Sequence, residues 1–210
     1  MRHLVSLPAG PGPHPLLCFL HGYDEAAPSP IDEALRRHGP LRGGNPARIT
    51  EEFIVLAPQL PEAGDVWRRY AAKVRTLVDE AIARYGADRE RLYLTGFSYG
   101  ANGAFDLALI HPGVWAALWP VDPTRPPARD PELPVWMSFG EIARARKSRF
   151  IAALRLKPAN GETGAHRLYV DRGDDHVGAA RRAYSDGRIY DWLLQHRHQA
   201  PGLAFPQENR

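Results

Sequence analysis

The serine in the pentapeptide Gly-Phe-Ser-Tyr-Gly at 96–100 is the residue whose type and surroundings point most directly to chemistry. The pattern G-x-S-x-G is typical of a sharp strand-to-helix turn that holds a serine in a strained backbone with its hydroxyl exposed. The flanking residues fit this turn, because 91–95 form a short apolar run prone to β structure and 101–110 carry apolar residues at helical spacing. The two glycines permit close packing at the turn, and the N-terminus of the following helix can stabilise developing negative charge. We therefore predict that Ser98 acts as a nucleophile.

A serine hydroxyl becomes a good nucleophile only when a neighbouring base, usually a histidine oriented by a carboxylate, removes its proton. His176 is the best placed base, since it lies in a polar loop between the last expected strand and the last expected helix. The alternative interpretation is an exposed loop histidine without a function. Other histidines have simpler explanations: His111 can cap a helix, and His196 and His198 fall at the end of the final helix.

Two backbone N–H groups are needed to bind the oxyanion that forms when a serine attacks a carbonyl group. One comes from the residue after the nucleophile, here Tyr99, and the other from the turn after an early strand. The run Phe-Leu-His-Gly-Tyr at 19–23 fits that turn, because an apolar segment ends there in His-Gly. We expect the N–H of Tyr23 to be the second donor, and His21 to fix the loop rather than to transfer protons.

Segments typical of strands and helices alternate along the chain, which predicts an α/β fold with a mainly parallel central sheet flanked by helices. We expect strands near 3–7, 15–20, 53–57, 91–95, 114–121, 134–139 and 166–171. We expect helices near 31–38, 66–85, 100–111, 146–155 and 178–196, and a terminal tail from 200 to 210. The chain of 210 residues, 44 % of them hydrophobic, can bury one sizeable core, so we predict a single domain at 1–210.

Charge and hydropathy argue against several other classes of protein. No apolar run approaches the roughly 18 residues that cross a membrane, and the first eight residues lack the features of a signal peptide. We therefore expect a cytoplasmic protein, unless a leader is missing from the sequence. The net charge is +3, and the densest basic cluster, at 144–149, lacks interleaved aromatic residues, so a solvated helix face is favoured over a nucleic-acid site. Cys18 is the single cysteine and lies in an apolar run, which predicts a buried thiol.

Several stretches, in the same order along the chain, resemble one superfamily. They are the oxyanion loop at 20–22 with Glu25, the approach to the next strand at 37–40 and 53–59, the elbow region at 85–88 and 92–100, and the histidine and closing helix at 176 and 190–194. By these motifs the chain resembles the α/β-hydrolase superfamily, in the branch of phospholipase/carboxylesterase, predicted-peptidase and polyhydroxybutyrate-depolymerase-like serine esterases. The resemblance covers nearly the whole chain and implies an α/β-hydrolase fold with a minimal lid or none.

The acid of the triad departs from the pattern of that superfamily. Members usually place an aspartate three residues after a glycine that ends the next-to-last strand; here the glycine is Gly140, and position 143 is alanine. Glu141 is the nearest carboxylate and is the preferred acid, because its longer side chain could reach from an earlier position. Asp122, at the end of the preceding strand, is the alternative. Asp171, Asp174, Asp175 or an incomplete triad also stay open.

Together these residues predict a serine hydrolase that cleaves carboxylic esters through an acyl-enzyme intermediate. The short chain and the lack of an obvious lid insertion favour small or short-chain esters. The expected partner is a small-molecule ester, with no nucleic acid and no membrane involved. No metal or organic cofactor is implied, and the Asp-Asp-His run at 174–176 lacks a second histidine or cysteine with supporting spacing. The alternatives are a peptidase or amidase on the same triad, and a non-catalytic binding protein with a hydrolase fold.

Overall fold

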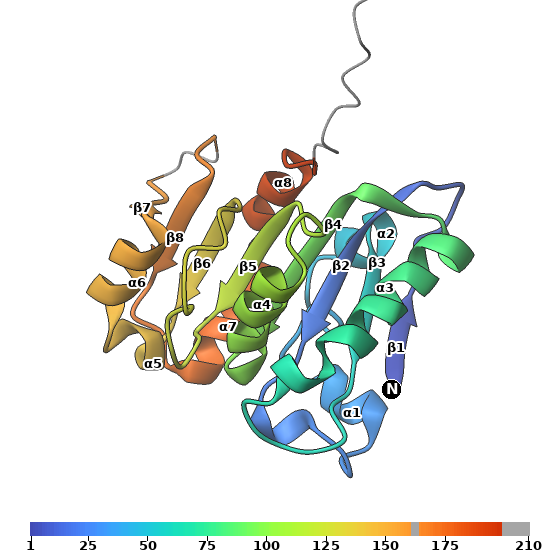
Figure 1. Cartoon of the computed structure of the whole chain (residues 1–210), viewed down its shortest axis with the longest axis horizontal. Coiled ribbons are helices and arrows are strands. Elements are labelled where there is room, and N and C mark those ends of the chain that lie inside the picture. Colours follow the sequence, from blue (N-terminus) through green and yellow to red (C-terminus); the bar gives the residue numbers. More distant parts are fainter. Residues whose placement is uncertain (161–163, 199–210) are drawn as a thin grey trace, which may run out of the picture.

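One sheet of eight strands, in the order β1-β3-β2-β4-β5-β6-β8-β7, runs through the computed structural model, which describes residues 1–160 and 164–198. The strands are β1 (His3–Ser6), β2 (His14–Leu20), β3 (Ile54–Pro58), β4 (Ala87–Phe97), β5 (Ala117–Val121), β6 (Val135–Phe139), β7 (Lys157–Pro158) and β8 (Arg167–Asp171). β1 pairs antiparallel with β3, and the other pairings are parallel. The mainly parallel α/β architecture predicted from the sequence is therefore confirmed (Figure 1).

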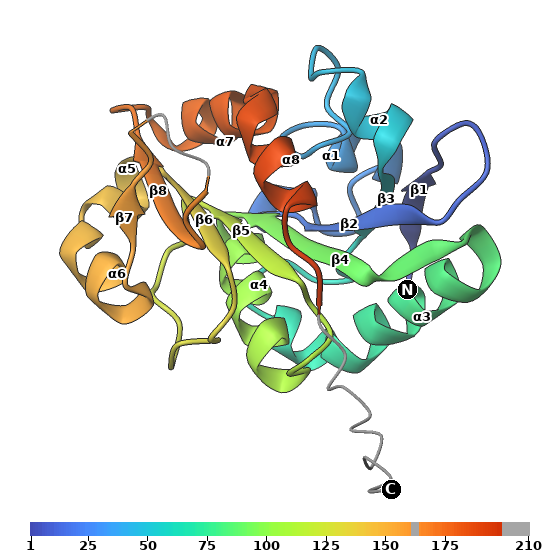
Figure 2. The ribbon, with the colours of Figure 1, turned by 90° about the horizontal axis from the view of Figure 1, so that it is seen from above.

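Helices cover both faces of this sheet (Figure 2). One face carries α1 (Ile31–Leu35), α2 (Arg48–Glu52), α7 (His176–Ser185) and α8 (Gly187–Leu194). The opposite face carries the 3-10 turn η2 (Trp67–Tyr70), α3 (Ala71–Tyr85), α4 (Tyr99–Ile110) and α6 (Lys147–Leu154). A second 3-10 turn, η1 (Tyr23–Glu25), follows β2, and α5 (Glu141–Arg144) follows β6.

The strand sequences explain why both faces are covered. Side chains alternate along a strand, so Leu16 and Cys18 of β2 pack into the core under α3 and α4, whereas Leu17 and Phe19 pack into the core under α7 and α8. All of these side chains are fully buried, including the predicted buried thiol. A strand that is apolar on both faces is stable only between two layers of helices.

The parallel pairing also collects the loops that matter for function. The carboxyl ends of neighbouring parallel strands meet at the same edge of a sheet, where ligands of open α/β sheets usually bind. At this edge β2 leads into η1, β4 into α4, β6 into α5 and β8 into the loop before α7. The elements predicted to hold the site are thus brought together by the topology.

Several element bounds differ from the sequence predictions. The helix expected at 66–85 begins as η2 and ends, as expected, at Gly86, which adopts a left-handed φ of 70°. The helix expected at 178–196 is two helices, because Asp186 has an extended backbone and its side chain accepts the N–H of Arg188 at the start of α8. The short elements α2, α5 and β7 were not expected. The predicted tail at 200–210 lies outside the described residues.

Candidate active site

Ser98 occupies the sharp turn between β4 and α4, as its motif predicts. Its φ of 55° and ψ of −118° fall in a region that serine rarely adopts, so the backbone is strained there. The flanking glycines are required by close contacts: a β-carbon on Gly96 would meet the Gly100 carbonyl, and one on Gly100 would meet the Leu20 carbonyl. The backbone of Ser98 is held to the neighbouring strand by a hydrogen bond from its N–H to the carbonyl of Val121, at 3.0 Å.

His176 begins α7 and lies beside this turn. The ring of Phe97, the residue before Ser98, packs against the imidazole with the ring centroids 4.5 Å apart. Within residues 1–160 and 164–198 no hydrogen bond joins the Ser98 hydroxyl to His176, and such bonds often tighten only in the complex with substrate. The structure therefore places the predicted base next to the predicted nucleophile.

Asp122 is the carboxylate that orients His176. Its Oδ2 lies 2.6 Å from His176 Nδ1, and the carboxylate is completely buried. Since an ionised carboxylate only accepts hydrogen bonds, Nδ1 is the donor, and Nε2 of a neutral ring is left without a proton. Asp122 has a left-handed φ of 43°, so a second residue with a strained backbone, besides Ser98, lies at this edge of the sheet.

The carboxylate of Asp122 is held in place by the start of α5. Its Oδ1 accepts the N–H groups of Gly140 at 2.9 Å and Ala143 at 2.8 Å. A third, longer contact of 3.4 Å joins the N–H of Ile142 to Oδ2. These donors fix the orientation of the carboxylate toward the imidazole.

Glu141, the acid preferred from the sequence, is not the hydrogen-bond partner of His176, and this expectation is corrected by the Asp122 contact. Glu141 is the first residue of α5 and its side chain is exposed. The turn from β6 into α5 directs backbone N–H groups, rather than the Glu141 side chain, toward the buried site. The carboxylate instead comes from the end of β5, the strand next to the one that carries Ser98.

The other acidic candidates have different partners. The carboxylate of Asp171 forms ion pairs with Arg144 and Lys147, at 2.9 and 2.8 Å. Part of the basic cluster at 144–149 is therefore paired within the chain. Asp174 pairs with Arg182, and Asp175 caps α7 by accepting the N–H of Gly178. These acids hold the loop that carries His176.

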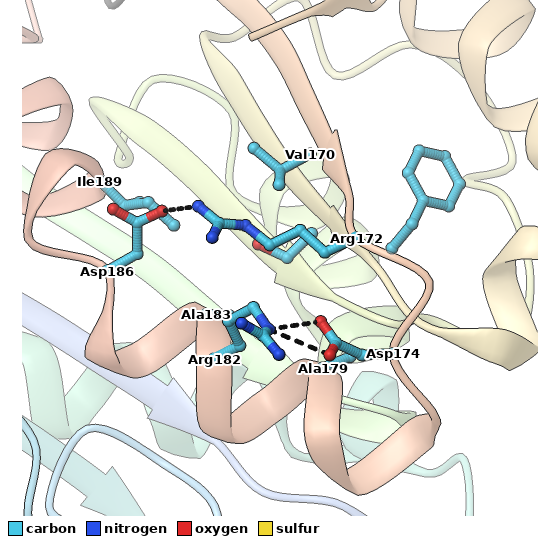
Figure 3. A pocket seen from close by; sticks show the side chains of 10 residues that line it. Val170, Arg172, Asp174, Ala179, Arg182, Ala183, Asp186 and Ile189 are labelled. Atoms are coloured by element: carbon cyan, nitrogen blue, oxygen red, sulfur yellow. Dashed lines mark hydrogen bonds and ion pairs between the residues drawn. The ribbon is translucent and has the colours of Figure 1, made fainter. Parts of the chain in front are cut away.

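A small cavity lies behind this loop, between β8 and α7 (Figure 3). Its volume of about 20 Å³ has room for little more than a water molecule. Ion pairs line it, with Arg182 on Asp174 and Arg172 on Asp186 (Figure 3). It contains neither Ser98 nor His176, and its size excludes an ester substrate.

Asn102 is a buried residue of the site that the sequence reasoning missed. It lies one helical turn after Ser98, and its side-chain oxygen accepts the N–H groups of Thr124 and Arg125, at 3.0 and 3.3 Å. Its amide nitrogen donates to Asp65 and to the hydroxyl of Thr124. Asn102 thereby ties the segment just after Asp122 to the helix that begins at the serine. Its spacing of four residues from Ser98 was the available signal.

The loop after β2 is fixed by His21. Its Nδ1 lies 2.7 Å from the Gly22 carbonyl and its Nε2 accepts the N–H of Leu60 at 2.9 Å, so each ring nitrogen has a backbone partner. Burial lowers the pKa of His21 to about 4, partly opposed by the Gly22 hydrogen bond, and the ring is neutral at neutral pH. This agrees with the structural role predicted for His21.

Tyr23 and Tyr99, whose N–H groups were predicted to bind an oxyanion, lie next to each other. Their rings meet at an angle of 69° with centroids 6.0 Å apart. Each begins a helical element, η1 or α4, so each N–H is one of those that a helix leaves without an internal partner. In the described part of the chain neither N–H donates to another group. Both donors are therefore available at the edge where Ser98 lies.

Comparison with solved structures identifies the fold. The chain matches a thermostable esterase with a TM-score of 0.70 at 19% identity, over 93% of this chain and 58% of that one. It also matches FphF, a fluorophosphonate-binding serine hydrolase of Staphylococcus aureus, with a TM-score of 0.63 at 12% identity, over 91% of each chain. The chain has an α/β-hydrolase fold. A third match is 2,6-dihydroxy-pseudo-oxynicotine hydrolase, with a TM-score of 0.64 at 16% identity, over 95% of this chain and 66% of that one.

Sequence comparison adds no further relative. No protein-family model matches the chain, and neither does a curated protein sequence. The α/β-hydrolase fold predicted from the motifs is thus confirmed by structure alone.

None of the helices formed by residues 1–160 and 164–198 is long and apolar enough to cross a membrane. Among the same residues no group of three or more His, Cys, Asp or Glu side chains is arranged to hold a metal ion.

Proposed function

We propose that this protein is a serine hydrolase that cleaves carboxylic esters with Ser98, His176 and Asp122. The observation that carries the proposal is the 2.6 Å contact between Asp122 and His176 beside a serine with strained backbone angles. A nucleophile, a base and a group that orients the base are the three parts that acyl transfer requires. Two of the similar solved structures are described as an esterase and a serine hydrolase, which supports the same chemistry.

The proposed reaction has two steps. In the first step the hydroxyl oxygen of Ser98 attacks the ester carbonyl while Nε2 of His176 takes the hydroxyl proton. The imidazolium then donates that proton to the leaving alcohol, and the acyl group stays bound to Ser98. In the second step His176 takes a proton from water, which attacks the acyl-enzyme; the bond between the acyl group and Ser98 breaks, the acid leaves, and His176 returns the proton to the Ser98 oxygen. Asp122 holds the ring in the required tautomer and stabilises the imidazolium without accepting its proton.

The N–H groups of Tyr23 and Tyr99 are the proposed oxyanion donors. Both belong to residues that begin a helical element, where a backbone donor points outward and the helix dipole favours negative charge. Removing one such donor from an enzyme typically costs about a hundredfold or more in kcat. The two donors are backbone groups, so a change of side chain at 23 or 99 leaves them in place.

The proposed substrates are small or short-chain esters. In support, Tyr23 is 56% exposed, and Val177, next to the proposed base, is 41% exposed. Exposed side chains thus lie beside both the proposed oxyanion donor and the proposed base. A peptidase or amidase would use the same residues with a poorer leaving group, so matched amide substrates belong in the same experiment.

The test is hydrolysis of p-nitrophenyl acetate, butyrate and octanoate by the wild type and by Ser98→Ala. We expect turnover that falls with acyl length and is lost in Ser98→Ala. The matched p-nitroanilides report amide cleavage. Equal background rates for wild type and Ser98→Ala on every ester and anilide would contradict the proposal and favour a binding protein with a hydrolase fold.

A further inference from the structure

Glu25 is a buried acid that takes no part in the steps of the proposed reaction. It ends η1 and is only 1% exposed. Its Oε2 accepts the N–H of Gly22 at 2.6 Å, while its Oε1 has no hydrogen-bond partner among the described residues. A buried carboxyl group that is only half satisfied destabilises a protein, so its presence calls for a functional reason.

Glu25 and Ser98 both lie close to Gly22. The position that a β-carbon would take on Gly22 is 3.1 Å from Glu25 Oε2 and 3.4 Å from the β-carbon of Ser98. The backbone of Glu25 is also anchored, because the side-chain amide of Gln59 donates to its carbonyl at 3.0 Å. The carboxyl group is thus held against Gly22, the residue before Tyr23, and Gly22 in turn lies close to the nucleophile Ser98.

From these contacts we propose that Glu25 is a positioning residue of the oxyanion loop: it accepts the Gly22 N–H and so fixes the backbone from which Tyr23 donates to the oxyanion. The inference rests on the proposed function. When the acceptor is removed, the backbone at Gly22 can turn and the Tyr23 N–H no longer points to the oxyanion. A displaced donor weakens the transition state more than the bound substrate, so kcat falls and KM changes little.

The protonation state of Glu25 affects this role. Burial raises its pKa to about 7, although the Gly22 hydrogen bond and the charges of Arg37 and His176 oppose the rise and Asp24 adds to it. Tyr184, on α7, is the other titratable group that senses the charge of Glu25. A neutral carboxyl group still accepts the Gly22 N–H, whereas a carboxylate places negative charge beside the developing oxyanion. The protonated form is therefore the active one, and kcat/KM falls as Glu25 ionises.

The experiment measures kcat and KM for p-nitrophenyl acetate between pH 5 and pH 9 in the wild type, Glu25→Gln and Glu25→Ala. Glutamine keeps an acceptor oxygen and cannot ionise, so we expect the kcat of Glu25→Gln to lie within about threefold of wild type at low pH. We also expect the decline of kcat/KM near pH 7, which the wild type should show, to be absent from this variant. Alanine removes the acceptor, and we expect kcat to fall about thirtyfold with KM within about twofold. Asp79→Asn, at an exposed position of α3 whose charge is not among those acting on Glu25, is the matched control and keeps the wild-type profile.

Two results would overturn the inference: a decline near pH 7 that persists in Glu25→Gln, or wild-type kcat in Glu25→Ala. A measurement without turnover covers the case of an inactive or poorly folded variant. In Ser98→Ala, NMR can follow the Glu25 carboxyl carbon and the Gly22 amide, which we expect to titrate together near pH 7. Independent titration would refute the inference. If the wild type hydrolyses no ester, the proposed function fails, and the NMR result still decides whether Glu25 holds the loop.

Discussion

Two buried carboxyl groups flank Ser98, and the protein satisfies them very differently. Asp122, on the β5 side, receives backbone N–H groups at both oxygens and the imidazole of His176. Glu25, on the β2 side, receives a single N–H from its own turn and leaves one oxygen without a partner. The comparison shows that burial alone does not define what a carboxyl group does. A carboxylate with a partner at each oxygen is fixed in orientation and can orient its base, whereas burial with a single partner raises the pKa of Glu25 to about 7.

The difference has a local cause in the chain. The turn from Gly140 into α5 presents several free backbone donors to the end of β5, where Asp122 lies. Glu25 sits inside a 3-10 turn of three residues and can reach only the donor at the start of that turn, Gly22. Four changes test how far the contrast holds.

The largest effect is expected from Asp122→Asn. The amide presents no charge to the imidazolium and can donate to Nδ1, which favours the wrong tautomer of His176, so we expect kcat to fall by about 10³–10⁴-fold. Ester hydrolysis at saturating substrate measures it. Glu141→Gln, on the exposed start of α5, is the matched control and should stay within about twofold. A large loss in Glu141→Gln with normal activity in Asp122→Asn would reverse the assignment of the acid.

Asn102→Ala tests the support behind Asp122. The substitution leaves the backbone N–H groups of Thr124 and Arg125 without their acceptor, so we expect unfolding free energy to fall by about 2–3 kcal/mol. The loosened segment should also lower kcat about tenfold. Urea unfolding and ester kinetics measure the two effects, with the exposed Asn160→Ala as control. Wild-type stability in Asn102→Ala would show that this network does not hold the acid.

The pH dependence of stability isolates Glu25. Its pKa is raised from an ordinary 4.5 to about 7, so the folded protein keeps a proton that the unfolded chain releases, and stability falls as pH rises through this window. His21, lowered from 6.5 to about 4, acts in the opposite sense, because the unfolded chain binds the extra proton. Comparing Glu25→Gln with wild type cancels the histidine contribution.

We therefore expect the unfolding free energy of Glu25→Gln, measured relative to that of the wild type, to be about 2 kcal/mol higher at pH 7.5 than at pH 4.5. Urea unfolding of both proteins at the two pH values measures this gain. A stability difference that does not vary with pH would mean that Glu25 is ionised in the folded protein much as it is in the unfolded chain. The two carboxyl groups would then differ in their partners but not in their charge.

The smallest effect is expected from Arg182→Ala. This residue pairs with Asp174 in the loop before His176, but its side chain is 54% exposed. Exposed ion pairs contribute little, so we expect a loss of about 0.5 kcal/mol and unchanged esterase kinetics. Thermal unfolding with and without 1 M salt measures the pair. A marked fall in kcat would show that surface contacts also fix the base.

The parts of the site that sequence reasoning found are those with local causes. The elbow around Ser98 is specified by two glycines that have no room for a side chain, and these lie within two residues of it. His176 could be found because a polar loop between a strand and a helix is visible in the sequence. The alternation of strands and helices likewise predicted the parallel sheet, since both faces of each central strand are apolar.

The acid could not be chosen by the same means. The contact between Asp122 and His176 spans 54 residues, and it depends on β5 lying next to β4 and on the direction in which α5 leaves β6. Neither is encoded near Glu141 or Asp122. Asn102 was missed, and Glu25 was noted only as part of the oxyanion-loop motif, for a related reason: only the packing shows that these polar side chains are buried.

The contact of Gly100 with the carbonyl of Leu20 has a consequence for protein engineering. It joins the start of α4 to the end of β2 through main-chain atoms, so the spacing of these two elements does not depend on the side chains at 23 and 99. The side chains at 23 and 99 can therefore be replaced without changing the spacing of the backbone beneath them. A library randomised at these two positions should change which esters are accepted while the machinery beneath them stays intact.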